Sequence, residues 1–226
     1  MLSVINFPMQ LFIDSANPQE VEEMAELGII NGVTTNPSLV GKAGVTYKEA
    51  VTRILKVVKD NVSLEVLSTD TAGMVAEGKK LAALGKNVVV KLPTTEEGLK
   101  ALQKLNKAGI RVNMTLVFSA NQALLVGKLG AYFVSPFIGR LDDIGQTGMD
   151  LIDEIKVIYD NYDIKTKILV ASVRNPIHVK DAAIIGADIA TCPYAVLKQL
   201  IKHPLTDAGM NKFLEDFKKS GQTPLV

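Results

Sequence analysis

Cysteine, histidine and tryptophan are scarce in this chain of 226 residues, which has one cysteine, two histidines and no tryptophan. The single cysteine, Cys192, excludes a framework of internal disulfides and is typical of a cytoplasmic protein. One cysteine and two widely separated histidines, His178 and His203, also lack the spacing of a metal-binding motif. We therefore expect a cytoplasmic location and no dedicated metal site.

The chain also lacks an excess of charge of either sign. It has 25 Lys and Arg residues against 24 Asp and Glu residues, and neither a basic stripe nor an acidic tail. Nucleic acid is therefore not an expected partner. Residues 1–13 lack the basic start and cleavage site of a secretory signal, and no run is long and uncharged enough to span a bilayer. We expect no membrane segment.

Motifs for nucleotide binding are missing as well. No Gly-x-Gly-x-x-Gly follows a predicted strand. Residues 73–79 have the spacing of a phosphate-binding loop, but Lys80 stands where Ser or Thr is required, and the segment fits the middle of a helix. Neither motif supports a nucleotide-binding function.

What the sequence does contain is a regular alternation of strand and helix patterns. Short runs rich in β-branched or aromatic residues precede stretches with helical spacing, at residues 11–15, 32–36, 64–68, 88–92, 111–117, 132–137, 167–172 and 187–192. Helix starts are indicated at Asn17, Thr46, Thr95 and Ser119. Eight β-α units without a linker predict an α/β fold, a single (β/α)8 TIM barrel over residues 1–226. An open doubly wound sheet is the alternative.

One more amphipathic helix is predicted after the eighth unit, at residues 206–219. Its apolar residues fall at i, i+3, i+4 and i+7, as Met210, Phe213, Leu214 and Phe217. This stripe could cover the floor of the barrel or pack on a neighbouring subunit, and the pattern alone leaves both open.

The fourth predicted strand carries a lysine among apolar residues. Lys91 follows three valines and precedes Leu92, a run typical of a strand buried on both faces. A lysine on an edge strand could reach solvent, but a closed barrel has no edge. Burial that lowers its pKa from about 10.4 by roughly three units would give a neutral amine able to attack a carbonyl.

Other polar residues lie at the predicted strand ends, where barrel enzymes place their active sites. They include Asp14, Thr34, Asn36, Glu65, Asn113, Thr115, Ser135 and Ser172, with Arg140 and Arg174 just beyond strands six and seven. We expect Asp14, Glu65 and Lys91 to meet, because burial alone would disfavour each of them. Structural roles remain open: Asp14 as a helix cap, Glu65 as an ion-pair partner of Lys91, and the arginines as solvated loop residues.

This set of residues suggests aldolase chemistry on a sugar phosphate. A Schiff base between lysine and a ketose draws electrons from the neighbouring carbon–carbon bond, which can then break and leave an enamine. Asp14 and Glu65 are suitable proton carriers. Arg140 and Arg174 would lie where barrels often hold a phosphate, and the planar guanidinium suits that anion.

Several motifs taken together resemble the transaldolases, in particular their short-chain microbial branch. The motifs are Phe12-Ile13-Asp14-Ser15, 32–38 (Gly-Val-Thr-Thr-Asn-Pro-Ser), Val90-Lys91-Leu92-Pro93, 113–119 (Asn-Met-Thr-Leu-Val-Phe-Ser), 135–140 (Ser-Pro-Phe-Ile-Gly-Arg) and 171–175 (Ala-Ser-Val-Arg-Asn). They span nearly the whole chain. The glycine-led Thr-Thr-Asn-Pro-Ser motif and the lysine strand are specific when they occur in this order.

The resemblance implies a class I aldolase type of barrel and a role for each matching residue. Lys91 would form the Schiff base, Asp14 would be the acid/base for carbon–carbon cleavage, and Glu65 with Thr115 would hold the catalytic water. Substrate hydroxyls or the intermediate would bind to Thr34, Asn36, Asn113, Ser135 and Ser172, and the phosphate to Arg140 and Arg174. No metal or organic cofactor is implied.

Two positions separate the transaldolases from the related fructose-6-phosphate aldolases. The aldolases typically have glutamine where this chain has Glu65, and tyrosine where it has Phe137. The resemblance therefore implies transfer of dihydroxyacetone from sedoheptulose 7-phosphate to glyceraldehyde 3-phosphate, in the pentose phosphate pathway. Fructose-6-phosphate aldolase is the near alternative, and a non-catalytic sugar-phosphate binding barrel the distant one. Short transaldolases also resemble ring-shaped homo-oligomers, often decamers, in which the last helix reaches a neighbour.

Overall fold

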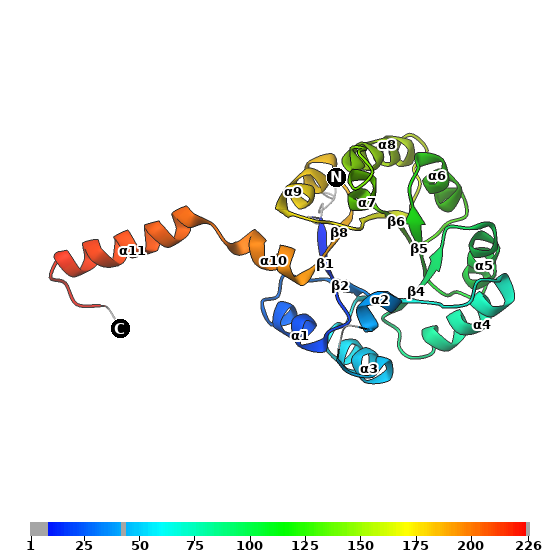
Figure 1. Ribbon diagram of the computed structural model, residues 1–226, viewed down its shortest axis with the longest axis horizontal. Coiled ribbons are helices and arrows are strands. Elements are labelled where there is room, and N and C mark those ends of the chain that lie inside the picture. Colours follow the sequence, from blue (N-terminus) through cyan, green and yellow to red (C-terminus); the bar gives the residue numbers. More distant parts are fainter. Residues whose placement is uncertain (1–8, 42–43, 225–226) are drawn as a thin grey trace, which may run out of the picture.

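The computed structural model describes residues 9–41 and 44–224, which form a closed barrel of eight parallel strands (Figure 1). The strands are β1 (Gln10–Asp14), β2 (Gly32–Thr34), β3 (Asn61–Glu65), β4 (Val88–Pro93), β5 (Val112–Val117), β6 (Phe133–Pro136), β7 (Lys167–Val170) and β8 (Ile189–Cys192). Each strand pairs with the next, and β8 pairs with β1. The predicted barrel is confirmed, and the open doubly wound sheet is wrong.

The strands alternate with helices, most of which surround the barrel. They are α1 (Pro18–Glu26), α2 (Pro37–Val40), α3 (Tyr47–Val57), α4 (Thr71–Ala82), α5 (Glu96–Lys107), α6 (Ala120–Lys128), α7 (Ile138–Asp142), α8 (Gly148–Asn161), α9 (Pro176–Ile185), α10 (Tyr194–Ile201) and α11 (Pro204–Lys219). Asn17, Thr46, Thr95 and Ser119 cap α1, α3, α5 and α6 with their side chains, as their sequence pattern predicts. The segment 73–79 lies within α4, so it does not form a phosphate-binding loop.

The barrel interior has an apolar layer below a polar one. Buried residues form a cluster separate from the core between strands and helices, namely Phe12, Val89, Phe133, Leu169, Ala171 and Ile189. Gly32 lies opposite Phe12, and a Cβ atom there would lie 2.5 Å from the Phe12 ring. Because side chains on one face of a strand repeat every two residues, the next inward positions carry Asp14, Lys91, Ser135 and Thr191. The polar layer is therefore at the carboxyl end of the strands.

The third strand begins and ends earlier than predicted. It spans Asn61–Glu65 instead of 64–68, and Leu67 beyond it is 72% exposed. The backbone N–H groups of Leu67 and Ser68 donate to Glu77 of α4 instead of to a neighbouring strand. The prediction was wrong because Asn61 and Ser63 are polar although buried, which hides the apolar pattern of this strand.

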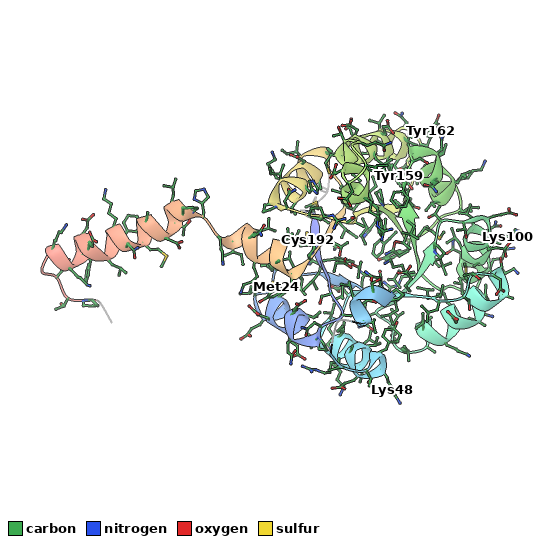
Figure 2. The ribbon with its side chains drawn as sticks, viewed as in Figure 1. Met24, Lys48, Lys100, Tyr159, Tyr162 and Cys192 are labelled. Atoms are coloured by element: carbon green, nitrogen blue, oxygen red, sulfur yellow. The ribbon has the colours of Figure 1, made fainter. Side chains whose placement is uncertain are left out.

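The C-terminal helix α11 does not cover the barrel floor. Figure 1 shows it extending away from the barrel beyond α10, and Figure 2 shows its side chains projecting around it. None of its residues 204–219 is buried, and its stripe is exposed, with Met210 at 59%, Phe213 at 74%, Leu214 at 59% and Phe217 at 41%. Packing on the floor is thus wrong, and packing on a neighbouring subunit stays a prediction. Among the described residues, no helix has the length and apolar character needed to cross a membrane.

Candidate functional site

A cavity of about 170 Å³ opens at the carboxyl end of the strands. It is lined by ten of the twelve residues that the sequence predicts for the site: Asp14, Thr34, Asn36, Lys91, Thr115, Ser135, Phe137, Arg140, Ser172 and Arg174. The other two do not line it but contact residues that do. Glu65 pairs with Lys91, and Asn113 accepts a hydrogen bond from Ser135. The predicted residues therefore come together at one place.

Lys91 is buried and points into the barrel. Only 4% of the residue is exposed, and its Nζ lies 3.0 Å from Glu65 Oε2 and donates to the carbonyl oxygen of Thr35 at 3.1 Å. The pairing follows from strand register, because Glu65 lies directly opposite Lys91 on the neighbouring strand. The lysine therefore does not lie at an edge or reach solvent. Two of the three directions in which Nζ can form hydrogen bonds are occupied, and Lys91 also lines the cavity.

Asp14 lies in the same polar layer, on the far side of β2 from Glu65. Thr34 Oγ1 donates to Asp14 Oδ1 at 2.7 Å, and Thr191 Oγ1 lies 2.6 Å from Thr34 Oγ1. Burial raises the pKa of Asp14, while the charge of Lys91 and the hydrogen bond from Thr34 oppose this rise. Asp14 is not a helix cap, because Asn17 caps α1. A carboxyl group with a raised pKa beside a lysine can serve as an acid or a base.

Thr115 has a buried hydroxyl without a partner. Its side-chain oxygen is the one buried side-chain polar atom in the described part of the chain that makes no hydrogen bond. The strand is irregular here: the register shifts between Met114 and Val117, and Leu116 has a φ of 59°. A buried polar group that lines a cavity and lacks a protein partner is a binding position for water or for a substrate atom. The water-holding role that the resemblance implies for Thr115 stays a prediction.

Asn113 and Ser135 belong to a fully buried network. Ser135 Oγ donates to Asn113 Oδ1 at 2.7 Å, and Asn113 Nδ2 donates to Ser63 Oγ at 3.1 Å. Asn113 is 0% exposed and lies beside Lys91 on the neighbouring strand. Its amide is therefore held in one orientation next to the amine.

The two arginines lie at the mouth of the cavity. The guanidinium of Arg140 is 5.0 Å from the centre of the Phe137 ring, and Arg174 Nη2 forms an ion pair with Asp143 Oδ2 at 2.9 Å. Helix α7, which carries Arg140, and the loop that carries Arg174 are in close contact, because the Gly139 N–H donates to the Ser172 carbonyl at 3.1 Å. A Cβ atom at position 139 would lie 2.2 Å from that carbonyl oxygen, so only glycine fits. Ser172 has a φ of 61°, a conformation rare for residues other than glycine.

Sequence reasoning missed three residues that belong to the site. Thr191 lines the cavity and contacts Thr34, Ser63 supports Asn113, and His178 accepts a hydrogen bond from the Arg174 N–H and lies 3.3 Å from Asp142. His178 is therefore not a free surface histidine. Thr191 could have been found, since it lies two residues after Ile189 at the end of the last predicted strand.

Comparison with known proteins identifies the family. Residues 11–223 match the family model described as transaldolase/fructose-6-phosphate aldolase. The chain belongs to this family. It is 60% identical to a "Probable transaldolase" of Thermoplasma volcanium over 93% of this chain and 96% of that protein. It is 57% identical to a "Probable transaldolase" of Geobacter metallireducens over 93% of this chain and 99% of that protein. The names of these relatives support a transaldolase-type enzyme.

A solved structure supports the fold alone. A mutant flavocytochrome b2 with pyruvate bound superposes with a TM-score of 0.59 at 14% identity, over 86% of this chain and 59% of that one. Among the described residues, no group of three or more His, Cys, Asp and Glu side chains could hold a metal ion.

Proposed function

We propose that this family member is a transaldolase. It transfers a dihydroxyacetone unit from sedoheptulose 7-phosphate to glyceraldehyde 3-phosphate, giving erythrose 4-phosphate and fructose 6-phosphate in the pentose phosphate pathway. The observation that carries the proposal is the buried Lys91, which lines the cavity, pairs with Glu65 through Nζ and interacts electrostatically with Asp14. The cytoplasm is its proposed location, and the reaction as written uses no cofactor.

The reaction begins with the amine of Lys91 and the ketose carbonyl. The nitrogen gives up a proton and attacks the carbonyl carbon, and the resulting carbinolamine loses water to form a protonated imine. We assign Glu65, 3.0 Å from Nζ, to the relay of these protons through a water, and the hydroxyl of Thr115 to the binding of that water from the side of the main cavity. The buried amide of Asn113 lies beside the imine nitrogen and limits its orientation.

Asp14 acts on the carbon–carbon bond. Its carboxylate accepts the proton of the substrate hydroxyl, the bond to the imine-bearing fragment breaks, and the aldose phosphate leaves. The electrons of the broken bond remain on the dihydroxyacetone fragment, which stays bound to the Lys91 nitrogen as an enamine. When the acceptor aldose binds, the enamine attacks its aldehyde, Asp14 returns the proton, and water hydrolyses the new imine. Thr34 holds the Asp14 carboxylate in place through its hydrogen bond of 2.7 Å.

The remaining residues hold the sugar phosphate. Arg140 and Arg174 present two guanidinium groups at the mouth, which suit a phosphate dianion. Asp143 is exposed, so Arg174 can leave it for the ligand at little cost. The hydroxyls and amides of Thr34, Asn36, Ser135 and Ser172 line the space between these arginines and Lys91 and are placed to bind the sugar hydroxyls.

A transaldolase needs an aldose acceptor to complete its reaction, whereas an aldolase releases dihydroxyacetone without one. Activity with and without an acceptor therefore distinguishes the two functions. With fructose 6-phosphate and erythrose 4-phosphate, the enzyme should form sedoheptulose 7-phosphate, and without an aldose acceptor it should release little free dihydroxyacetone. Mass spectrometry and an enzymatic assay for dihydroxyacetone measure both products. Phe137→Tyr should shift products toward release, because a phenolic hydroxyl can orient a water that protonates the enamine, whereas phenylalanine cannot. Rapid release by the unchanged enzyme would instead support fructose-6-phosphate aldolase.

We also propose that α11 packs on a second copy of the chain, in a homo-oligomer for which a decamer is expected. Its exposed apolar stripe supports this assignment. Light scattering should show an oligomer, and a Phe213→Glu/Leu214→Glu variant should form smaller species. Lys212→Glu, which makes the same total change in charge on the opposite face of α11, is the control and should leave assembly intact. A monomeric unsubstituted protein would contradict this assignment.

A further inference from the structure

A second chamber lies behind Lys91. Its volume is about 260 Å³, and it is lined by Thr35, Asn36, Pro37, Val40, Tyr47, Glu65 and Leu67. Lys91 does not line this chamber, and Glu65 does not line the main cavity, although the two residues are 3.0 Å apart. The Lys91–Glu65 pair therefore lies in the wall between the two spaces.

The loop between β2 and α2, residues 35–36, forms the rest of this wall. Thr35 lines the second chamber and accepts a hydrogen bond from Lys91 Nζ through its carbonyl oxygen, at 3.1 Å. Asn36 lines both spaces. The side chain of Glu65 is 16% exposed against 6% for Lys91, and the second chamber is the space that Glu65 borders. Glu65 can therefore be reached by solvent from the second chamber, without passage through the main cavity.

The chamber offers polar atoms for water inside an otherwise apolar wall. Pro37, Val40 and Leu67 supply the apolar part, whereas the Glu65 carboxylate and the Tyr47 hydroxyl supply polar groups. Burial and the nearby charge of Glu65 raise the pKa of Tyr47, so its hydroxyl stays protonated and can donate a hydrogen bond. Water enters such a space when it finds two or more polar partners.

We propose that this chamber is the water and proton route of the active site. The proposal rests on the Schiff-base function proposed above. Each imine that forms at Lys91 releases one water, and each imine that is hydrolysed consumes one, with protons passing through Glu65. The sugar phosphate fills the main cavity from Lys91 to the arginines, so water and protons exchange with solvent on the other side of the Lys91–Glu65 pair. No residue of the phosphate site is involved.

Exchange of the ketose carbonyl oxygen measures this route directly. In water labelled with oxygen-18, each cycle of imine formation and hydrolysis replaces the carbonyl oxygen of fructose 6-phosphate with one from solvent, which mass spectrometry detects. Val40→Phe adds bulk to the chamber and leaves Lys91, Glu65 and the arginines unsubstituted. It should slow exchange by on the order of tenfold. This effect is smaller than the loss of a positioned proton-transfer group would cause, because Glu65 itself remains in place. The fraction of Lys91 trapped by borohydride after equilibration should not change, because only the rate is limited.

Val40→Ala is the matched control and should exchange at the rate of the unsubstituted enzyme, because it widens the chamber. Val40→Leu, a smaller increase in volume, gives an intermediate slowing and serves if the phenylalanine variant does not fold. Normal exchange in both larger variants, with normal trapping of Lys91, would overturn the water route and leave the proposed function intact. If the unsubstituted enzyme traps no adduct at Lys91, the proposed function itself is wrong.

Discussion

Replacing Lys91 with methionine should abolish both the covalent adduct and the transfer reaction. Methionine has a similar length and no amine, so fructose 6-phosphate and borohydride should add no mass to the peptide that contains position 91. Transfer should fall by at least about 10³-fold, or about 4 kcal/mol in transition-state stabilisation, because the enzyme loses its covalent intermediate. Peptide mapping by mass spectrometry, together with a coupled assay of transfer, measures both effects.

The ion pair requires a control, because Lys91→Met also leaves the largely buried Glu65 without its partner. Losing one member of a buried pair costs up to about 3–5 kcal/mol, and the chamber beside Glu65 reduces this value. The double variant Lys91→Met/Glu65→Gln removes the charge from both and should regain much of the lost thermal stability without any activity. An adduct or transfer activity in either variant would show that Lys91 has a structural role only.

The polar layer of the barrel could be predicted because strand periodicity and barrel topology constrain the same residues. A lysine in an apolar strand and an aspartate at a strand end are costly when isolated, and closure of the sheet brings them together. Glu65 was placed correctly although its strand was misread, because it belongs to both the predicted and the observed segment. The same misreading concealed Ser63, whose support of Asn113 follows only from the observed register.

Other features depend on contacts that a single sequence does not encode in its periodicity. The stripe on α11 indicates that these residues need a partner, but the floor of the barrel and a second subunit satisfy that need equally well. The second chamber could not be predicted either, because periodicity does not show that Lys91 lines one space and Glu65 the other. Likewise, the positive φ of Ser172 places it against Gly139, and no residue preference predicts a serine in that conformation.

Asp14→Asn should separate carbon–carbon cleavage from imine formation. Asparagine has nearly the same shape but cannot accept the substrate proton, so transfer should fall by about 10²–10⁴-fold. Lys91 and Glu65 remain in place, and the borohydride adduct should therefore still form. The unsubstituted enzyme should lose activity as the pH falls through the raised pKa of Asp14, since cleavage requires the carboxylate. This acid limb should disappear from the residual activity of the variant, and an unchanged pH profile would assign it to another group.

The pH dependence of folding stability gives an independent test of the Asp14 carboxyl group. Burial determines whether its contribution rises or falls with pH. The pKa of Asp14 is raised above its ordinary value of 3.8, so the folded protein binds this proton more strongly than the unfolded chain does. Its contribution therefore favours folding at low pH and is lost as the pH rises from about 3.8 through the folded-state pKa. Asp14→Asn mimics the protonated form and should raise the melting temperature at neutral pH, by an amount that shrinks as the pH is lowered through this window. A variant less stable than the unsubstituted protein at neutral pH would show that the carboxylate's attraction to Lys91 and Thr34 outweighs its desolvation.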